Sequence, residues 1–404
     1  MKLSNYNERL KKSFRQKSLG FFSFKEKYLK IMVQIYIHIP FCAAKCNYCA
    51  FNSKISTADE RENYVDALIK TLNSSLLTLH SIYFGGGTPT ILTLNQIEKI
   101  FKEIKKNFQV EKNSEITIEA NPGTVDENYL RGLRKIGFNR ISLGVQSFND
   151  KLLKILGRIH DSKIAIETVK TARKIFENVS VDLMYGLPNQ TLNDVKFDIE
   201  IAKNLNVNHI SIYGLEVEPN TKFFQLNEVG KLNLPDEKIC GDMYDYITET
   251  LPKFGYKRYE VSNFAKIGYE SRHNTGYWTG AKYFGFGAGA HSYDGNFRTS
   301  NISNVAEYIK KIRAGCDVSQ VEEVVTTNAA MEEFCFLGLR MTAGIDAKNF
   351  YQRFGKNIFE VYGKVIEKNL RLGLLKVDGD KIFLTERGMK IGNFVFADFL
   401  LSDT

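Results

Sequence analysis

The sequence predicts an α/β fold: a partial barrel of six parallel β-strands with their helices, followed by a smaller α+β region that ends in a winged-helix-like module. The length of 404 residues suits two to three domains, and 43% hydrophobic with 25% charged residues is typical of a globular chain. Short β-branched and aromatic runs alternate with stretches of helical periodicity. Polar and Gly-rich residues collect where those runs end.

Six short runs bounded by Gly, Pro or Asn indicate buried strands. They span residues 35–41, 81–86, 115–121, 140–147, 179–186 and 209–216. Helices of period 3.6 lie between them, and one apolar helical face carries Ile97, Ile100, Phe101, Ile104 and Phe108. Helix N-caps are expected at Thr93 with Gln96, Thr124 with Glu127, Asp161 and Thr191. Gly137 is expected to end a helix.

Strands that alternate with helices are expected to be parallel and joined by right-handed crossovers. A doubly wound sheet and a full or partial (β/α) barrel both satisfy that pattern. A doubly wound sheet gathers its ligand at one crevice, whereas a barrel distributes functional residues over many strand ends. Here such residues follow five strands: Cys42 to Cys49, Gly85 to Thr88, Glu119 with Asn121, Gln146, and Asp182. Their distribution favours the barrel.

The predicted domains follow changes in composition along the chain. They are a basic head over residues 1–32, the barrel over 33–240, a Gly- and aromatic-rich region over 241–325, and the winged-helix-like module over 326–404. In the last segment, helical periodicity precedes two strand-like runs that flank the turn Asp378-Gly379-Asp380, which predicts a hairpin. We expect this module to serve in structure or docking, because it carries no dense basic stripe.

The net charge of +9 is concentrated at the start of the chain. Residues 1–31 hold nine Lys or Arg and two Glu, so this head carries +7 and the other residues carry +2. A nearly neutral body counts against a nucleic-acid partner. The head lacks the apolar region of a secretion signal. A disordered tail, a true start at Met32, a transit peptide and peripheral contact with an anionic membrane remain as interpretations.

Six cysteines divide into one tight group and three scattered residues. Cys240, Cys316 and Cys335 have apolar neighbours and are expected in the core. The chain shows no export signal and no disulfide framework, which favours a reducing, cytoplasmic compartment. The tight group therefore predicts metal or redox chemistry.

That group reads CAAKCNYC, with Cys42, Cys46 and Cys49 spaced C-x₃-C-x₂-C. Zinc usually takes four protein ligands in two C-x₂-C pairs, and no second pair is present. Three thiolates can hold three irons of a [4Fe–4S] cluster and leave the fourth iron open, as a reactive cluster requires. A catalytic cluster is favoured over zinc and over unligated thiols. His38, on the preceding strand, is expected to support the loop.

Further motifs accompany the cysteines: YIHIPFCAAKCNYC, YFGGGTPT, IEANPG, SLGVQSF, DLMYGLP and HNTGYW. From about residue 33 onward the chain resembles the radical S-adenosylmethionine (SAM) enzymes. Within them it is similar to the family of oxygen-independent coproporphyrinogen III oxidase and its heme-chaperone relatives. The resemblance implies that SAM chelates the open iron and that the reduced cluster cleaves it to a 5′-deoxyadenosyl radical.

Residues that match the family's SAM-binding positions are Tyr36, Tyr48, Gly86, Gly87, Thr88, Glu119, Gln146, Arg158 and Asp182. The last three match positions that hold a second SAM in the oxidases. Read singly, Glu119 and Asp182 could cap strand ends, and Arg158 could form a surface ion pair. Occurring together on successive strand ends, these residue types suit a ligand with both a sulfonium and a carboxylate.

Two features separate the oxidases from the chaperones. The oxidases carry a fourth cysteine at the position of Phe51, so the oxidase pattern is broken here. The segment HNTGYW resembles a chaperone signature and gives heme-binding candidates, namely His273, Asn274, Tyr277 and Trp278. A neutral imidazole can ligate heme iron, and aromatic side chains can pack on the porphyrin.

The resemblance therefore implies a heme chaperone with a [4Fe–4S] cluster, SAM and heme as cofactors. Its expected partners are heme-acceptor proteins such as respiratory cytochromes, and an electron donor such as flavodoxin or ferredoxin. Whether the protein also performs radical chemistry stays open. The first alternative is a coproporphyrinogen III oxidase, and the second is a zinc-bearing DNA-binding protein.

Overall fold

The computed structural model describes residues 32–73 and 77–401, and the described residues from Val33 onward form one compact unit. The predicted basic head, residues 1–32, lies outside them except for Met32. Among the described helices, none is both long and apolar enough to cross a membrane.

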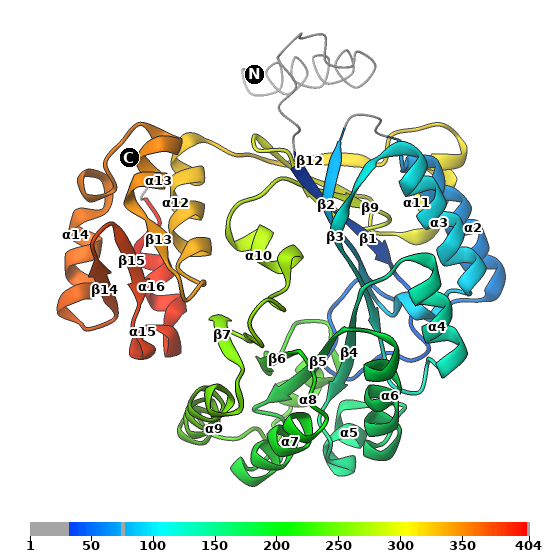
Figure 1. Ribbon diagram of the computed structural model, residues 1–404, viewed down its shortest axis with the longest axis horizontal. Helices are drawn as coiled ribbons and strands as arrows, with labels where there is room; N and C mark the ends of the chain where they lie inside the picture. Colours follow the sequence, from blue (N-terminus) through cyan, green and yellow to red (C-terminus); the bar gives the residue numbers. More distant parts are fainter. Residues whose placement is uncertain (1–31, 74–76, 402–404) are drawn as a thin grey trace. The chain divides into compact units, whose positions relative to one another are not determined.

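The six predicted strands are confirmed. They are β1 (Met32–Ile39), β2 (Thr78–Gly86), β3 (Gln109–Ala120), β4 (Arg140–Gln146), β5 (Asn178–Tyr185) and β6 (His209–Gly214). The helices between them are α2 (Ala58–Thr71), α3 (Leu94–Asn107), α4 (Glu127–Ile136), α5 (Asp150–Leu156), α6 (Ser162–Ile175) and α7 (Leu192–Asn204). Strands β2 to β6 pair in parallel in sequence order, as βα crossovers produce. In Figure 1, α3, α4 and α6 lie along one side of these strands.

The sheet extends beyond the six predicted strands at both edges. The additional strands are β7 (Lys257–Glu260), β8 (Asn263–Ala265), β9 (Tyr283–Phe286), β10 (His291–Tyr293), β11 (Phe297–Asn301) and β12 (Ser319–Val324). The strand order is β12-β11-β10-β9-β1-β2-β3-β4-β5-β6-β8-β7. Because β1 and β6 are hydrogen-bonded to β9 and β8 rather than to each other, the barrel is partial, as predicted. The helices of this part are α8 (Lys222–Glu228), α9 (Glu237–Thr250), α10 (Arg272–Trp278) and α11 (Val305–Arg313).

Three of the four predicted N-caps are confirmed. Thr93 forms a capping box with Gln96, and Asp161 and Thr191 cap α6 and α7. The fourth prediction is wrong, because α4 begins at Glu127 and is capped by Asp126, which accepts a hydrogen bond from the Tyr129 backbone amide. The Thr124 hydroxyl instead donates to the Asn121 carbonyl at 2.7 Å, which closes the turn after β3. Gly137 ends α4 with φ 131°, as predicted.

The two faces of the barrel strands differ in chemistry. Along β1, Val33, Ile35, Ile37 and Ile39 belong to the main hydrophobic core, and the alternate positions face the barrel interior. Buried interior residues of β1 to β6 are polar: Gln34, Ser81, Glu115, Thr117, Arg140, Ser142, Ser180 and His209. Closed (β/α)₈ barrels fill this space with branched apolar side chains. A polar interior leaves the barrel able to hold a polar ligand.

The C-terminal segment has its own hydrophobic core. Its elements are α12 (Thr327–Gly338), β13 (Ile345–Asp346), α13 (Ala347–Phe354), α14 (Ile358–Arg371), β14 (Leu375–Asp378), β15 (Lys381–Leu384), α15 (Glu386–Lys390) and α16 (Gly392–Asp398). The predicted hairpin is confirmed, since β14 and β15 pair antiparallel across Gly379 and Asp380. Helices packed on a three-stranded sheet form the expected α+β region.

The three scattered cysteines do not share one environment. Cys335 is buried in α12, as predicted. Cys240 in α9 is half-buried, and Cys316 is exposed in the turn that follows α11. The prediction of a core position is therefore confirmed for Cys335 alone, since Cys240 is only half-buried, and it was wrong for Cys316. Its local sequence looked apolar, but it lies where the chain leaves the helix and turns toward β12.

Candidate functional site

The loop after β1 carries the three clustered cysteines and is anchored to distant segments. The Cys42 amide donates to the Lys54 carbonyl at 2.9 Å, which closes the loop on itself. The backbone amide of Asn47 donates to the Leu156 carbonyl at 2.9 Å, and its side-chain amide donates to Ile155 at 2.8 Å. The end of α5 therefore fixes the middle of the loop. Cys42, Cys46 and Cys49 are half-buried free thiols.

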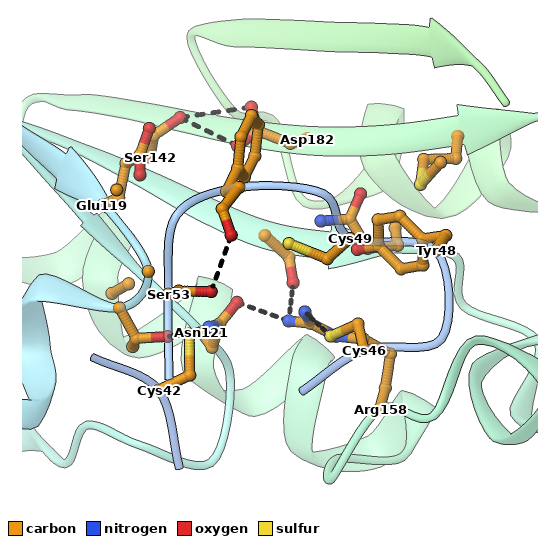
Figure 2. A pocket seen from close by; sticks show the side chains of 18 of the residues that line it. Cys42, Cys46, Tyr48, Cys49, Ser53, Glu119, Asn121, Ser142, Arg158 and Asp182 are labelled. Atoms are coloured by element: carbon orange, nitrogen blue, oxygen red, sulfur yellow. Dashed lines mark hydrogen bonds between the residues drawn. The ribbon is translucent and has the colours of Figure 1, made fainter. Parts of the chain in front are cut away.

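These thiols face a cavity of about 580 Å³ inside the barrel. Of the residues predicted to hold the cluster or SAM, those that line the cavity are Cys42, Cys46, Tyr48, Cys49, Gly86, Gly87, Thr88, Glu119, Gln146, Arg158 and Asp182. Figure 2 shows the labelled members of this set around one space. The structure thus brings together residues that span 140 positions of sequence, from Cys42 to Asp182.

Tyr36 is the one predicted SAM residue outside this lining. Its hydroxyl is hydrogen-bonded to His38 Nδ1 at 3.1 Å, and its ring stacks on Tyr83 with centroids 6.1 Å apart. Tyr83 itself lines the cavity. Tyr36 therefore stands behind a cavity residue and supports it.

The glycines at the end of β2 let the chain approach the cysteine loop closely. Gly86 has φ 113°, a conformation that favours glycine. A Cβ on Gly87 would lie 2.5 Å from the Phe41 carbonyl oxygen and 2.8 Å from Cys42 Sγ. The amides of Gly87 and Thr88 donate to Ile39 and Phe41 at 2.9 and 2.7 Å. The Thr88 hydroxyl also contacts Cys42 Sγ at 3.6 Å, so this turn positions the first thiol.

Arg158 connects the cysteine loop to the strand ends. Its Nη1 donates to Cys46 Sγ at 3.3 Å, and its Nη2 donates to the Gly144 carbonyl at 2.6 Å and to Asn121 Oδ1. The guanidinium therefore links the second cysteine of the loop to the ends of β3 and β4. Gln146, at the end of β4, has φ 70°, an unusual conformation for a non-glycine residue and one that concentrates at functional sites.

The inner wall of the cavity carries the carboxyl groups of Glu119 and Asp182 and the guanidinium of Arg140. Tyr83 donates to Glu119 at 2.7 Å, and the Ser142 hydroxyl donates to both oxygens of Asp182 at 3.2 and 3.3 Å. Burial raises the pKa of Glu119 to about 7 and also raises the pKa of Asp182. Arg140, 2% exposed, supplies the positive charge between them, and its Nε has no hydrogen-bond partner.

Sequence reasoning missed Arg140 and Tyr83 as cavity residues. Arg140 is the first residue of an apolar strand run, and a charge at a buried strand position was the available signal. Asn121 was noted only as a strand-end residue, yet it hydrogen-bonds both Arg158 and the Thr88 hydroxyl.

The predicted heme-binding residues lie on α10, where His273 is buried and the other three are half-buried. His273 is 1% exposed, with Nδ1 hydrogen-bonded to the Ser81 hydroxyl and Nε2 to the Tyr277 hydroxyl, both at 3.0 Å. Asn274 lines the cavity. Trp278 packs under Arg340, whose guanidinium lies 4.4 Å from the ring centroid. In this arrangement neither ring nitrogen of His273 is free to ligate a metal.

The three thiols restrict which metal cofactors the loop can hold. Thiolates are soft ligands that select iron–sulfur clusters, zinc or copper(I) over hard cations. Within residues 32–73 and 77–401, no three His, Cys, Asp or Glu side chains converge on a site for a single metal ion. Three free thiols on one loop and the close approach of Gly87 to Cys42 fit a cluster held by three cysteines.

The partial barrel and its cysteine-lined cavity fit the radical SAM proteins, and comparison with known proteins gives the same class. The Radical SAM superfamily model matches residues 36–222, and the model of the HemN C-terminal domain matches residues 325–391. The structure is similar to that of coproporphyrinogen III oxidase (HemN) from Escherichia coli, with a TM-score of 0.81 over 92% of this chain and 91% of the other, at 24% identity. The chain belongs to the radical SAM superfamily, which implies a [4Fe–4S] cluster and SAM.

Two relatives identify the family to which the chain belongs within this superfamily. The chain is 40% identical to the heme chaperone HemW of Bacillus subtilis over 377 residues, which cover 91% of this chain and 99% of that protein. It is 39% identical to the heme chaperone HemW of Lactococcus lactis over 370 residues, which cover 91% and 97%. Within the superfamily, the chain belongs to the HemW family.

Proposed function

We propose that this protein is a heme chaperone that carries a [4Fe–4S] cluster and SAM and passes heme to acceptor proteins. The observation that carries the proposal is identity of about 40% with proteins named heme chaperone HemW along 91% of the chain. That range includes both the barrel and the C-terminal region, so the similarity is not limited to the parts common to all radical SAM proteins.

Cys42, Cys46 and Cys49 would hold the cluster, which when bound supplies one electron for the reductive cleavage of SAM. Arg158, whose Nη1 donates to Cys46 Sγ, would hold that sulfur in place beside the strand ends. Glu119 is suited to accept a hydrogen bond from the SAM ammonium or a ribose hydroxyl, because Tyr83 holds its carboxylate in place. Gln146 and Asp182 would meet further polar groups of the ligand at the neighbouring strand ends.

Phe51 supports the chaperone over the oxidase. It occupies the position where the oxidase pattern has a fourth cysteine. Its side chain is 70% exposed and contributes to the lining of the cavity. The oxidase alternative requires radical decarboxylation of porphyrin propionates, and it lacks that fourth sulfur donor here.

The heme site remains a prediction for His273, Asn274, Tyr277 and Trp278. Ligation by His273 would require the loss of its hydrogen bonds to Ser81 and Tyr277 together with exposure of a buried ring. Heme-requiring proteins such as respiratory cytochromes are the proposed acceptors, flavodoxin or ferredoxin is the proposed electron donor, and the cytoplasm is the proposed compartment.

The proposal is tested by two assays on one anaerobically reconstituted preparation. The first mixes the heme-loaded protein with an apo-cytochrome and follows acceptor absorbance, and we expect heme to move to the acceptor. The second supplies coproporphyrinogen III, SAM and a reductant, and we expect no decarboxylated product. Decarboxylation without heme transfer would overturn the chaperone in favour of the oxidase.

A further inference from the structure

We propose that His273 is a positioning residue of the SAM cavity, which holds the ring of Tyr83 and through it the carboxylate of Glu119. The inference rests on the proposed SAM site. It assigns the HNTGYW segment a role in the barrel that does not depend on heme ligation. Three connected observations carry it: the stack on Tyr83, the docking of α10, and the position of Asn274.

The first observation is a continuous path from α10 to the cavity. The rings of His273 and Tyr83 stack with centroids 4.9 Å apart and planes at 27°. The Tyr83 hydroxyl donates to Glu119 Oε1 at 2.7 Å. The position of the tyrosine ring therefore decides where the carboxylate oxygen lies. The imidazole packs against that ring, as does the ring of Tyr36.

The second observation is that α10 is fastened to the barrel strands by its backbone. Glu115, on β3, accepts hydrogen bonds from the backbone amides of Arg272 and His273, both at 3.1 Å. A carboxylate at a helix N-terminus is favoured by the helix dipole as well. A Cβ on Gly276 would lie 2.1 Å from Gln34 Oε1, so the helix approaches β1 as closely as glycine permits.

The third observation is that the same helix reaches the cavity directly. Asn274 lines it, next to the residue that stacks on Tyr83. The remaining aromatic residue, Trp278, faces Arg340 of the C-terminal segment. One side of α10 thus completes the SAM cavity, while its last residue contacts the region beyond the barrel.

The protonation state of His273 agrees with this role. Burial lowers its pKa to about 3, helped by the nearby charges of His80 and Arg140, so the ring is neutral at physiological pH. A neutral ring can donate at one nitrogen and accept at the other, which matches hydroxyl partners on both sides. The ring is held in one orientation by Ser81 and Tyr277.

A second buried histidine provides a matched control. His209 is also fully buried, with Nδ1 hydrogen-bonded to the Ser180 hydroxyl at 2.8 Å and Nε2 to the Tyr259 hydroxyl at 2.9 Å. Its chain of contacts leads through Tyr259 to the backbone amide of Ser271. Ser271 is the N-cap of α10, so His209 has the same burial, the same kinds of partner and a link to the same helix, but no ring contact with Tyr83. The variant therefore controls for the docking of α10.

The experiment measures SAM affinity and heme affinity separately. His273→Ala, Tyr83→Phe, the double variant and His209→Ala are reconstituted anaerobically, and iron and sulfide contents confirm the cluster. SAM affinity is measured by calorimetry and heme affinity by absorbance titration. We expect His273→Ala and Tyr83→Phe each to weaken SAM binding about tenfold, the scale of one hydrogen bond to a charged group. The double variant should be no weaker than Tyr83→Phe, because both changes act through one contact.

His209→Ala should leave SAM affinity within about twofold of the parent. The heme titration of His273→Ala shows whether the same residue also serves the predicted heme site. Loss of heme binding with intact SAM binding in His273→Ala would overturn the inference and make His273 a heme ligand. Additive losses in the double variant would also overturn it. Failure of the parent protein to bind SAM would instead remove the proposed SAM site. Should His273→Ala not fold, His273→Phe, which keeps the stacked ring, should retain SAM affinity, and a tenfold loss there would contradict the role of the stack.

Discussion

The two ends of the barrel interior are built from the same strands but differ in construction. At the C-terminal ends, Gly86 and Gln146 adopt positive φ, and Glu119 has a raised pKa. At the N-terminal ends, α10 closes the interior through backbone bonds to Glu115 and through the packing of His273. Unusual backbone angles mark the C-terminal ends, which we propose hold SAM and call the open end. The docking of a helix marks the N-terminal ends, which we call the closed end.

The largest expected effect is the loss of iron from a cysteine variant at the open end. Cys42→Ser removes a thiolate that Gly87 and Thr88 hold in place. We expect the variant to lose most of the about four irons per chain that a [4Fe–4S] cluster supplies. Iron and acid-labile sulfide after anaerobic reconstitution provide the measurement. Cys316→Ser, which changes an exposed thiol, is the control and should retain full iron. Full iron in Cys42→Ser would show that the loop does not hold a cluster.

A pair of glycine substitutions compares the ends directly. In Gly87→Ala the new Cβ meets the Phe41 carbonyl at 2.5 Å and the Cys42 sulfur at 2.8 Å, so the cysteine must shift and iron content should fall. In Gly276→Ala the Cβ meets Gln34 Oε1 at 2.1 Å, which should cost about 1–3 kcal/mol of folding stability.

Thermal unfolding and iron content, measured on both variants, test the contrast. Gly276→Ala should unfold at lower temperature while keeping its iron, and Gly87→Ala should lose iron. Equal loss of iron in both variants would mean that the closed end holds the cluster loop as strongly as the open end does.

The open end could be predicted from sequence because its signals are local. The three cysteines lie within eight residues, and each strand end carries its own polar or Gly-rich residues. A predicted barrel was enough to bring these residues together. The closed end could not be predicted in this way. The contact between Ser81 and His273 joins positions 192 apart, and nothing in HNTGYW says that its histidine faces inward. Arg140 was missed because a single charge in an apolar strand does not reveal which groups surround it.

The pH dependence of SAM binding tests the role of Glu119 at the open end. Burial and the charge of Asp182 raise the pKa of Glu119 to about 7, against the opposing effects of Tyr83, Gly86 and Arg140. The carboxyl is therefore mostly protonated at pH 6 and mostly ionised at pH 8. The ionised form favours a cationic or hydrogen-bond-donating ligand, so SAM affinity should rise about tenfold over that interval. Calorimetry at constant iron content measures it. Glu119→Gln should give a weaker affinity that does not change with pH, and an unchanged profile in that variant would assign the titration to another group.

The smallest expected effect lies at the opening of the cavity. Phe51→Cys restores the cysteine spacing of the oxidases at an exposed position, and the carbonyl that accepts from Lys45 at 2.7 Å is unchanged. We expect stability to change by less than about 0.5 kcal/mol and SAM affinity by less than about twofold. Phe394→Cys, which alters a side chain that is 75% exposed on α16, controls for the added thiol.

Coproporphyrinogen oxidase activity should stay absent in both variants, because the relatives named HemW match along 91% of the chain rather than at one position. Gain of that activity in Phe51→Cys alone would mean that a single side chain separates the two functions and that the rest of the cavity already suits the oxidase reaction.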